Sequence, residues 1–287
     1  MNPPAQIKLI ECPRDAMQGF ERNIATPAKV SYLRQLLQVG FDTLDMGSFV
    51  SPKAIPQMAD TAEVLRQLPL AASSSNVLVI VANERGAREA LAFPDIDFLG
   101  FPFSVSETFQ HRNTNAGREQ AFATVANLQE LCVAAQRKLV LYLSMAFGNP
   151  YGEAYHPDEV LAWAHRLLPL GITIFSLADT VGVASPDQVF ELTAAFKKEF
   201  AHIETGLHLH ASPTSWKEKV EAGLQAGCCR FDAALGGVGG CPMAADQLVS
   251  NLNMELLVQW LDEKGYSTGI DKEQLLACSL QAQQLFV

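Results

Sequence analysis

The stretch ITIFSLADTVGVASPDQVFELTAAFKKEFAHIETGLHLHA (residues 172–211) contains the repeating pattern that decides the fold. It opens with a short apolar run at 172–179 and closes with another at 204–211. The segment between them, 186–200, has the spacing of an amphipathic helix. This order predicts a βαβ unit with two parallel strands. The strands are continuous apolar runs, which is typical of a sheet that helices cover on both faces.

The same unit recurs outward in both directions along the chain. Further strands are predicted at 7–12, 41–47, 76–82, 96–104, 139–147 and 228–235, and helices at 26–40, within 53–68, after Asn83, and at 115–138, 157–171 and 215–227. We expect Thr26 to cap helix 26–40, with Pro27 in its first turn and Gly40 as its stop. Eight units of this size predict a (β/α)₈ TIM barrel, with an open doubly wound sheet as the alternative.

No linker rich in proline or glycine divides the chain. We therefore expect one domain over residues 1–287, including a C-terminal helical extension from about residue 244. The formal net charge of −10 makes nucleic acid an unlikely partner, because an acidic surface repels phosphates. Neither a membrane span nor a signal or transit peptide is recognisable. The six cysteines show no regular spacing and predict reduced thiols in a cytoplasmic protein.

Two of the six histidines, His208 and His210, are two positions apart in the predicted strand 204–211. Residues i and i+2 of a strand point to the same face, so both imidazoles can reach one metal ion. The alternative is a pair of partly buried histidines, each with its own hydrogen-bond partner.

Polar residues recur where the predicted strands end, and in a barrel these ends meet at one mouth. They are Arg14 and Asp15, Asp45 and Ser48, Ser144 with Tyr151 in the loop after it, Asp179 and Thr180, the two histidines, and Cys241 in a glycine-rich loop. Asp15 can join the histidines because strands 1 and 7 flank strand 8, although a salt bridge to Arg14 or a helix cap would also explain it. The mixed nitrogen and oxygen set suits Mg²⁺ or Mn²⁺, with Zn²⁺ as an alternative.

Six motifs, in this order, are the anchors of a resemblance that covers nearly the whole chain: PRDAMQ (13–18), GSFVSPKAIPQMAD (47–60), GNPYGE (148–153), SLADTVGVASP (176–186), HLH (208–210) and GGVGGCP (236–242). With these motifs the sequence resembles the 3-hydroxy-3-methylglutaryl-CoA (HMG-CoA) lyase family, within the metallolyase TIM barrels. The resemblance implies a metal-dependent carbon–carbon lyase that cleaves HMG-CoA to acetyl-CoA and acetoacetate. It also implies an acyl-CoA substrate, a homodimer and a role such as leucine degradation.

The resemblance also implies roles for particular residues. Asp15, His208, His210 and Asn251 would hold the divalent cation, with Asn253 as a rival to Asn251. Arg14 would be the catalytic arginine and Cys241 the lid thiol, which would act as an acid. A metal-bound histidine is a poor base, so Asp15 and Asp45 are the candidates for the base. The residues that would bind substrate are Gln18, Ser48, Ser144, Tyr151, Asp179 and Thr180.

The chain departs from the family pattern in three places near these residues. RDAMQGFERN (14–23) stands where the family usually has a glycine after the RD pair and a tighter turn. Asp45 stands where the family usually has a glutamate, and Ala211 replaces the acidic residue that usually follows the second histidine. The alternatives are therefore a related aldolase or Claisen-type acyl-CoA synthase, or a barrel that binds acyl groups or metal without turnover.

Overall fold

The computed structural model describes residues 6–240 and 250–286, and its strands form a closed parallel barrel. The strands are β1 (Lys8–Glu11), β2 (Thr43–Ser48), β3 (Asn76–Ile80), β4 (Phe98–Ser104), β5 (Lys138–Ser144), β6 (Ile174–Asp179), β7 (Glu204–Ala211) and β8 (Arg230–Ala233). Each pairs with the next in parallel, β8 pairs with β1, and the ring is complete. The predicted TIM barrel is confirmed. A short strand, β9 (Ser250–Asn251), runs antiparallel to the end of β7.

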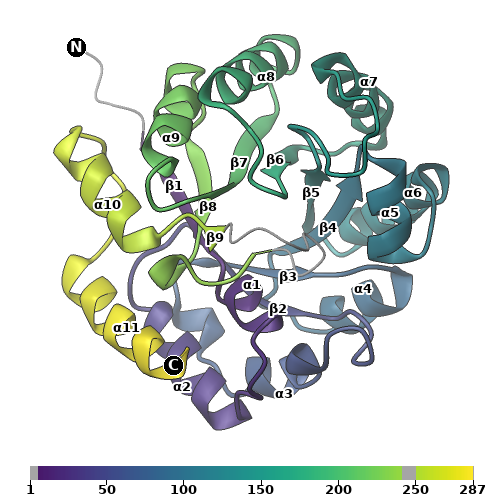
Figure 1. The fold of residues 1–287 in the computed structure, drawn as a ribbon. Coiled ribbons are helices and arrows are strands. Elements are labelled where there is room, and N and C mark those ends of the chain that lie inside the picture. Colours follow the sequence, from purple (N-terminus) through teal and green to yellow (C-terminus); the bar gives the residue numbers. More distant parts are fainter. Residues whose placement is uncertain (1–5, 241–249, 287) are drawn as a thin grey trace.

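The helices that follow the strands form a ring around the barrel (Figure 1). They are α2 (Thr26–Leu36), α3 (Thr61–Arg66), α4 (Glu84–Leu91), α6 (Arg118–Ala134), α7 (Pro157–Leu167), α8 (Pro186–Glu199) and α9 (Trp216–Gln225), with α10 (Met254–Glu263) and α11 (Lys272–Leu285) after the last strand. Short 3₁₀ turns occur at η1 (Pro56–Met58), η2 (Leu70–Ala72), η3 (Leu168–Leu170) and η4 (Leu235–Gly237). Two further helices, α1 (Pro13–Gln18) and α5 (Glu107–Thr114), directly follow β1 and β4, and α1 lies near the centre of the view in Figure 1.

The hydrophobic core has two main parts. The larger fills the space between the outer face of the barrel and the helices, and it includes residues of α10 and α11 such as Leu257, Leu261 and Leu275. The smaller lies inside the barrel, where Leu78, Tyr142 and Ile174 from three different strands meet.

The structure corrects three local expectations. Arg14 and Asp15 do not end a strand, because Pro13 starts the helix α1 directly after β1. Thr26 is inside α2, where its hydroxyl donates to Asp60, and Ala25 is the N-cap residue. The predicted helix 115–138 is shorter, because Asn115 adopts a left-handed conformation that ends α5, and α6 begins after it.

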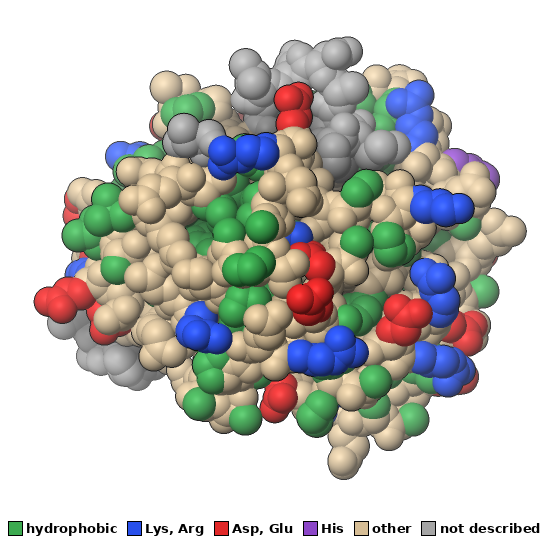
Figure 2. Space-filling view, turned by 90° about the horizontal axis from the view of Figure 1, so that it is seen from below, with side chains coloured by type: hydrophobic (Ala, Val, Ile, Leu, Met, Phe, Trp, Pro, Cys, Tyr) green, Lys and Arg blue, Asp and Glu red, His purple; other side chains and the backbone are tan. Residues whose placement is uncertain are grey.

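The helices and thiols of the described part of the chain bear on two of the sequence predictions. None of its helices combines the length and hydrophobicity that crossing a bilayer requires. The described cysteines, Cys12, Cys132, Cys228, Cys229 and Cys278, are free. Acidic and basic side chains are interspersed on the face drawn in Figure 2.

Candidate active site

Helix α1 brings a buried arginine and a buried aspartate to the mouth of the barrel. Arg14 Nε lies 3.2 and 3.1 Å from the two carboxylate oxygens of Asp45 on β2, and its Nη1 lies 3.0 Å from Asp15 Oδ1. The salt bridge between Arg14 and Asp15 is therefore present. It engages only Oδ1 of the Asp15 carboxylate, because Oδ2 faces the other side of the site.

The two histidines of β7 point toward Asp15. One ligand atom from each of Asp15, His208 and His210 lies within 4.8 Å of the others. His210 Nδ1 lies 2.9 Å from the backbone oxygen of Asp179, and His208 Nδ1 lies 3.1 Å from Asp232 Oδ2. A carbonyl and a carboxylate only accept, so each Nδ1 carries a hydrogen, and in the neutral form of each ring Nε2 has the free lone pair.

Asn251 contacts Asp15, whereas Asn253 caps a helix. The side-chain amide of Asn251 donates to Asp15 Oδ2 at 2.7 Å and to the backbone oxygen of Val238 at 3.0 Å. Asn253 Oδ1 accepts from Leu256 N and caps α10. The structure thus places Asn251, and not Asn253, against Asp15. Gln18, at the end of α1, donates to Asp15 Oδ1 at 2.7 Å.

The charges of the site favour an ionised Asp15 beside a neutral His210, whereas His208 accepts a proton more readily. Burial would lower the pKa of His208, but the carboxylates of Asp232 and Asp15 outweigh it and raise that pKa. Burial alone would raise the pKa of Asp15, but Arg14, the two histidines and the Asn251 amide lower it. Burial, and then the nearby His208, lowers the pKa of His210 to about 4. Burial would lower the pKa of Arg14, but the carboxylates of Asp45 and Asp15 outweigh it and raise that pKa. Arg14 therefore stays protonated.

These residues fit a divalent cation. His210 Nε2 is buried and has no hydrogen-bond partner within residues 6–240 and 250–286. A buried polar atom without a partner is costly, and a cation held between this nitrogen, His208 Nε2 and Asp15 would satisfy it. The Asn251 side-chain oxygen could add a fourth ligand. Cys12, His208 and Asp232 form a second group with metal-ligand spacing deeper in the barrel.

Asp179 and Thr180, at the end of β6, support the site from the side. The Asp179 carboxylate accepts from Lys219 Nζ at 2.7 Å, and Lys219 also donates to the backbone oxygens of His210 and Gly182. Thr180 Oγ1 accepts from Met145 N at 2.8 Å. Their side chains are thus engaged with Lys219 on α9, with Ala184 before α8 and with the turn after β5, rather than with Asp15.

The other residues predicted to bind substrate are spread around the mouth. Ser48 Oγ donates to the Ile80 backbone and accepts from Val50 N, and Ser144 is buried at the end of β5. Tyr151 stacks under Arg112, whose guanidinium carbon lies 4.6 Å from the ring centre. No hydrogen bond or ion pair joins these three to the Asp15 group in the described residues.

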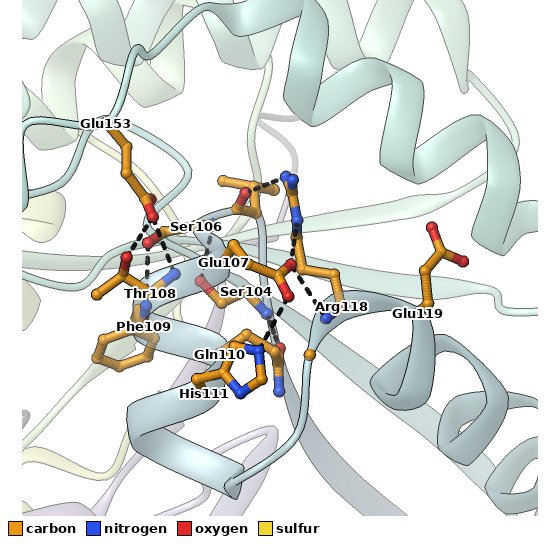
Figure 3. A network of polar contacts seen from close by, with 12 residues as sticks. Ser104, Ser106, Glu107, Thr108, Phe109, Gln110, His111, Arg118, Glu119 and Glu153 are labelled. Atoms are coloured by element: carbon orange, nitrogen blue, oxygen red, sulfur yellow. Dashed lines mark hydrogen bonds and ion pairs between the residues drawn. The ribbon is translucent and has the colours of Figure 1, made fainter.

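A separate polar network links helices at the rim of the barrel, next to the ends of β4 and β5 (Figure 3). Arg118 Nε and Nη1 bind Glu107 at 2.8 Å and Glu159 at 2.6 Å, which joins the first turns of α5, α6 and α7. Glu153 accepts from Thr108 N at 2.9 Å. The network lies beside a cleft of about 330 Å³.

The described start of the glycine-rich loop packs against α1. Gly239 has a φ of +90°, and a Cβ there would lie 2.7 Å from Asp15 O and from Ala16 Cα. Only glycine permits so close an approach. Cys241, the predicted lid thiol, lies outside the described residues.

Sequence reasoning missed Asp232 and Lys219. Asp232 follows Arg230 by two positions in the run CCRFDAAL, so the two charged residues share one face of an otherwise apolar strand, and that pattern was the available signal. Lys219 gives no such signal. A lysine on a helix is usually exposed, as Lys217 of the same helix is, and nothing in the sequence marks Lys219 as different.

Comparisons with known proteins agree with this geometry. A family model described as HMGL-like matches residues 6–281. The mitochondrial hydroxymethylglutaryl-CoA lyase of Mus musculus is 32% identical over 276 residues, which are 95% of this chain and 83% of that protein. The hydroxymethylglutaryl-CoA lyase of Pseudomonas mevalonii is 30% identical over 275 residues, 93% of this chain and 88% of that protein.

Solved structures show the same similarity. The HMG-CoA lyase of Bacillus subtilis superposes with a TM-score of 0.92 at 28% identity and covers 99% of this chain and 95% of its own. An HMG-CoA lyase from Acinetobacter baumannii, in complex with coenzyme A and 3-methylmalate, has a TM-score of 0.90 at 30% identity and covers 98% of this chain and 91% of its own.

Proposed function

This chain belongs to the HMGL-like family and is a carbon–carbon lyase, and from that premise we propose that it cleaves HMG-CoA to acetyl-CoA and acetoacetate. The observation that carries the proposal is the group of Asp15, His208 and His210 at the mouth of the barrel, with Arg14 directly beside it. The relatives that bear the name of this activity span more than nine-tenths of the chain.

Asp15, His208, His210 and Asn251 would hold a divalent cation, which we propose is Mg²⁺ or Mn²⁺. When bound, such an ion supplies Lewis acidity to oxygens of the substrate and orients the bond to be broken. The chain's own contribution is a fixed, buried donor set. Asp179 O and Asp232 hold the two imidazoles, and Asn251 and Gln18 hold the Asp15 carboxylate.

In the reaction, the tertiary hydroxyl loses its proton and the adjacent carbon–carbon bond breaks. The hydroxyl carbon becomes the ketone of acetoacetate, and the electron pair leaves on the thioester fragment as its enolate. Arg14 keeps its proton, so its role is to stabilise the negative charge of that enolate oxygen.

The base is proposed to be Asp15 or Asp45. Arg14 donates to both oxygens of Asp45, and the carboxylate keeps a further lone pair that could accept a proton. Cys241 is proposed to return a proton to the enolate carbon, which completes acetyl-CoA. The start of its loop supports this role, because Gly239 lies against Asp15 and Ala16.

Gln18, Ser48, Ser144, Tyr151, Asp179 and Thr180 stay predictions as substrate-binding residues. Of these, Gln18 has the strongest support, since its amide lies 2.7 Å from Asp15. A single domain, a homodimer and a cytoplasmic location also stay predictions. Light scattering on the purified protein and fractionation of cells test the latter two.

A coupled assay of acetoacetate release tests the proposed function. The protein is stripped with a chelator, and cleavage of HMG-CoA is measured before and after Mg²⁺ or Mn²⁺ is added back. We expect the activity to be lost in chelator and restored by either ion, because the cation supplies transition-state stabilisation that the side chains alone do not.

The same assay separates the alternatives. Undiminished cleavage by the metal-free protein would remove the ion from the reaction. Condensation of acetyl-CoA with a 2-oxo acid, without cleavage, would favour a synthase. Tight binding of HMG-CoA by calorimetry without product would favour a barrel that has lost turnover.

A further inference from the structure

Asp232 is the residue that contacts His208 on the side away from Asp15. Its Oδ2 lies 3.1 Å from His208 Nδ1, the carboxylate is 1% exposed, and the pair joins neighbouring strands in register. The role of Asp232 is not explained by the reaction, because His208 stands between it and the Asp15 group.

The two histidines are held in different ways. His210 Nδ1 faces a backbone oxygen, which any sequence would supply at that place. His208 depends on a side chain instead, and Asp232 is the hydrogen-bond acceptor for its Nδ1 among the described residues. Loss of that carboxylate would let the His208 ring rotate or carry its hydrogen on Nε2, the nitrogen that would bind the cation.

The barrel supports a carboxylate at this depth with further charges. Arg230, two residues before Asp232 on the same face of β8, is 2% exposed, and its Nη1 lies 3.0 Å from Glu204 Oε1. Lys8 donates to the other oxygen of Glu204 at 2.7 Å. Gly206 makes room for Arg230, since a Cβ there would lie 2.8 Å from Arg230 Cδ. Charges of alternating sign therefore lead from the start of β7 to His208.

We propose that Asp232 is a positioning residue that holds His208 with its hydrogen on Nδ1 and its Nε2 lone pair directed at the cation. The inference rests on the metal site of the proposed function and adds a residue to it. A carboxylate behind a histidine ligand fixes both the tautomer and the orientation of the ring, and its loss commonly weakens metal binding by about 10–100-fold.

The test is Mn²⁺ binding to the full chain, measured by electron paramagnetic resonance without substrate. We expect Asp232→Ala and Asp232→Asn to bind Mn²⁺ about 10–100-fold more weakly than the wild type. Glu204→Gln is the matched control, because it removes one negative charge from the same row without touching His208, and its affinity should stay near that of the wild type. Circular dichroism checks the fold of each variant.

A second measurement follows the tautomer itself. In protein labelled with ¹⁵N-histidine and free of metal, at mildly alkaline pH, the His208 signal should show hydrogen on Nδ1. A His208→Gln variant assigns that signal. In Asp232→Ala we expect the Nε2–H form to appear, while the His210 signal stays unchanged.

Wild-type affinity in Asp232→Ala would overturn the proposal. An equal loss in Glu204→Gln would also overturn it, because the affinity would then depend on the total negative charge of this row and not on the contact with His208. Equal losses in Asp232→Ala and Cys12→Ser would also overturn it, because they would place the ion among Cys12, His208 and Asp232. A wild type that binds Mn²⁺ but releases no acetoacetate would reject the proposed function alone, and one that binds no Mn²⁺ would reject both.

Discussion

Arg14 bridges two buried carboxylates, and this contact explains why an arginine is needed at that position. Its planar fork reaches both oxygens of Asp45 while Nη1 reaches Asp15. A lysine has one point charge and cannot make these contacts together. Arg14 thus aligns β2 with α1 and leaves a positive charge beside the Asp15 group.

Arg14→Lys is expected to lower kcat/KM for HMG-CoA cleavage by about 100-fold or more, because the stabilisation of the enolate oxygen depends on the placement of the donors. Arg14→Ala should lower it further. Steady-state kinetics measure the effect, and thermal unfolding shows whether the fold survives. A normal rate in Arg14→Lys would contradict the assigned role.

Asn251 and Asn253 are a matched pair of amides two residues apart. We expect Asn251→Ala to weaken Mn²⁺ binding by about 10-fold or more, because the amide holds Asp15 and could also supply a ligand oxygen. Asn253→Ala should leave Mn²⁺ affinity unchanged and lower the free energy of unfolding by about 1 kcal/mol, since the cap of α10 is lost. Calorimetric titration and urea unfolding separate the two effects, and the reverse pattern would make Asn253 the ligand.

At the level of elements, the ends of β6 and β7 are joined through α9. Lys219 on α9 is 4% exposed, and its ammonium donates to the Asp179 carboxylate, to His210 O and to Gly182 O. All three hydrogens of the ammonium therefore have an acceptor. This contact fixes where β7 ends, and hence the height of the two histidines in the barrel.

Lys219→Met is expected to lower the free energy of unfolding by about 3–5 kcal/mol, because it leaves the buried Asp179 carboxylate without its partner. Lys217→Met, on the exposed side of the same helix, is the control and should change stability by less than about 0.5 kcal/mol. Urea unfolding measures both, and equal effects would show that Asp179 does not need Lys219.

The rim network makes stability depend on pH through Glu153. Burial alone would raise the pKa of Glu153, but hydrogen bonds from Ser106 and Thr108 outweigh it and lower that pKa. A lowered folded-state pKa adds stability that is present above the unfolded value of about 4.3 and is lost as pH falls through the folded value.

The wild type should therefore lose more stability between neutral pH and acid pH than Glu153→Gln does. Glu63→Gln, at an exposed site on α3, is the control and should keep the wild-type acid dependence. Urea midpoints at both pH values measure the difference. The same acid loss in all three proteins would show that Glu153 adds nothing.

For the molecule as a whole, the C-terminal helices share the core of the barrel. Leu257, Leu261 and Leu275 belong to the same buried cluster as the residues between the strands and the ring helices, and Trp260 of α10 packs edge-on against Trp216 of α9. This continuity supports the proposal that the chain folds as one domain.

Leu261→Ala should lower the free energy of unfolding by about 2–5 kcal/mol, because Leu261 is fully buried. Tryptophan fluorescence and far-ultraviolet circular dichroism should still report one shared transition. Leu256→Ala, on the exposed side of α10, is the control and should have little effect. Two separate transitions would make α10 and α11 an independent unit.

Much of the fold was predictable because its signals are local. A βαβ unit is visible in the spacing of apolar residues within about forty positions of the sequence, as at 172–211. Helix α1 was missed because six residues carry too little periodicity, although Pro13 marked its start. Pro27 was predicted correctly in the first turn of α2, but the cap fell on Ala25 because Thr26 binds Asp60 across the fold.

The sequence by itself determined the repeating unit, the number of strands and the shared face of His208 and His210, since each of these follows from the local geometry of a helix or a strand. The place of Asp15 beside the histidines could be expected only by assuming a closed ring, and that of Asp232 was decided by the tertiary structure alone. Closing the ring pairs β8 with both β1 and β7, which brings α1 and β8 to the histidines from distant parts of the chain. The roles of Asp232 and Lys219 belong to this second class. Whether a charged side chain is buried and paired depends on neighbours that no stretch of sequence contains.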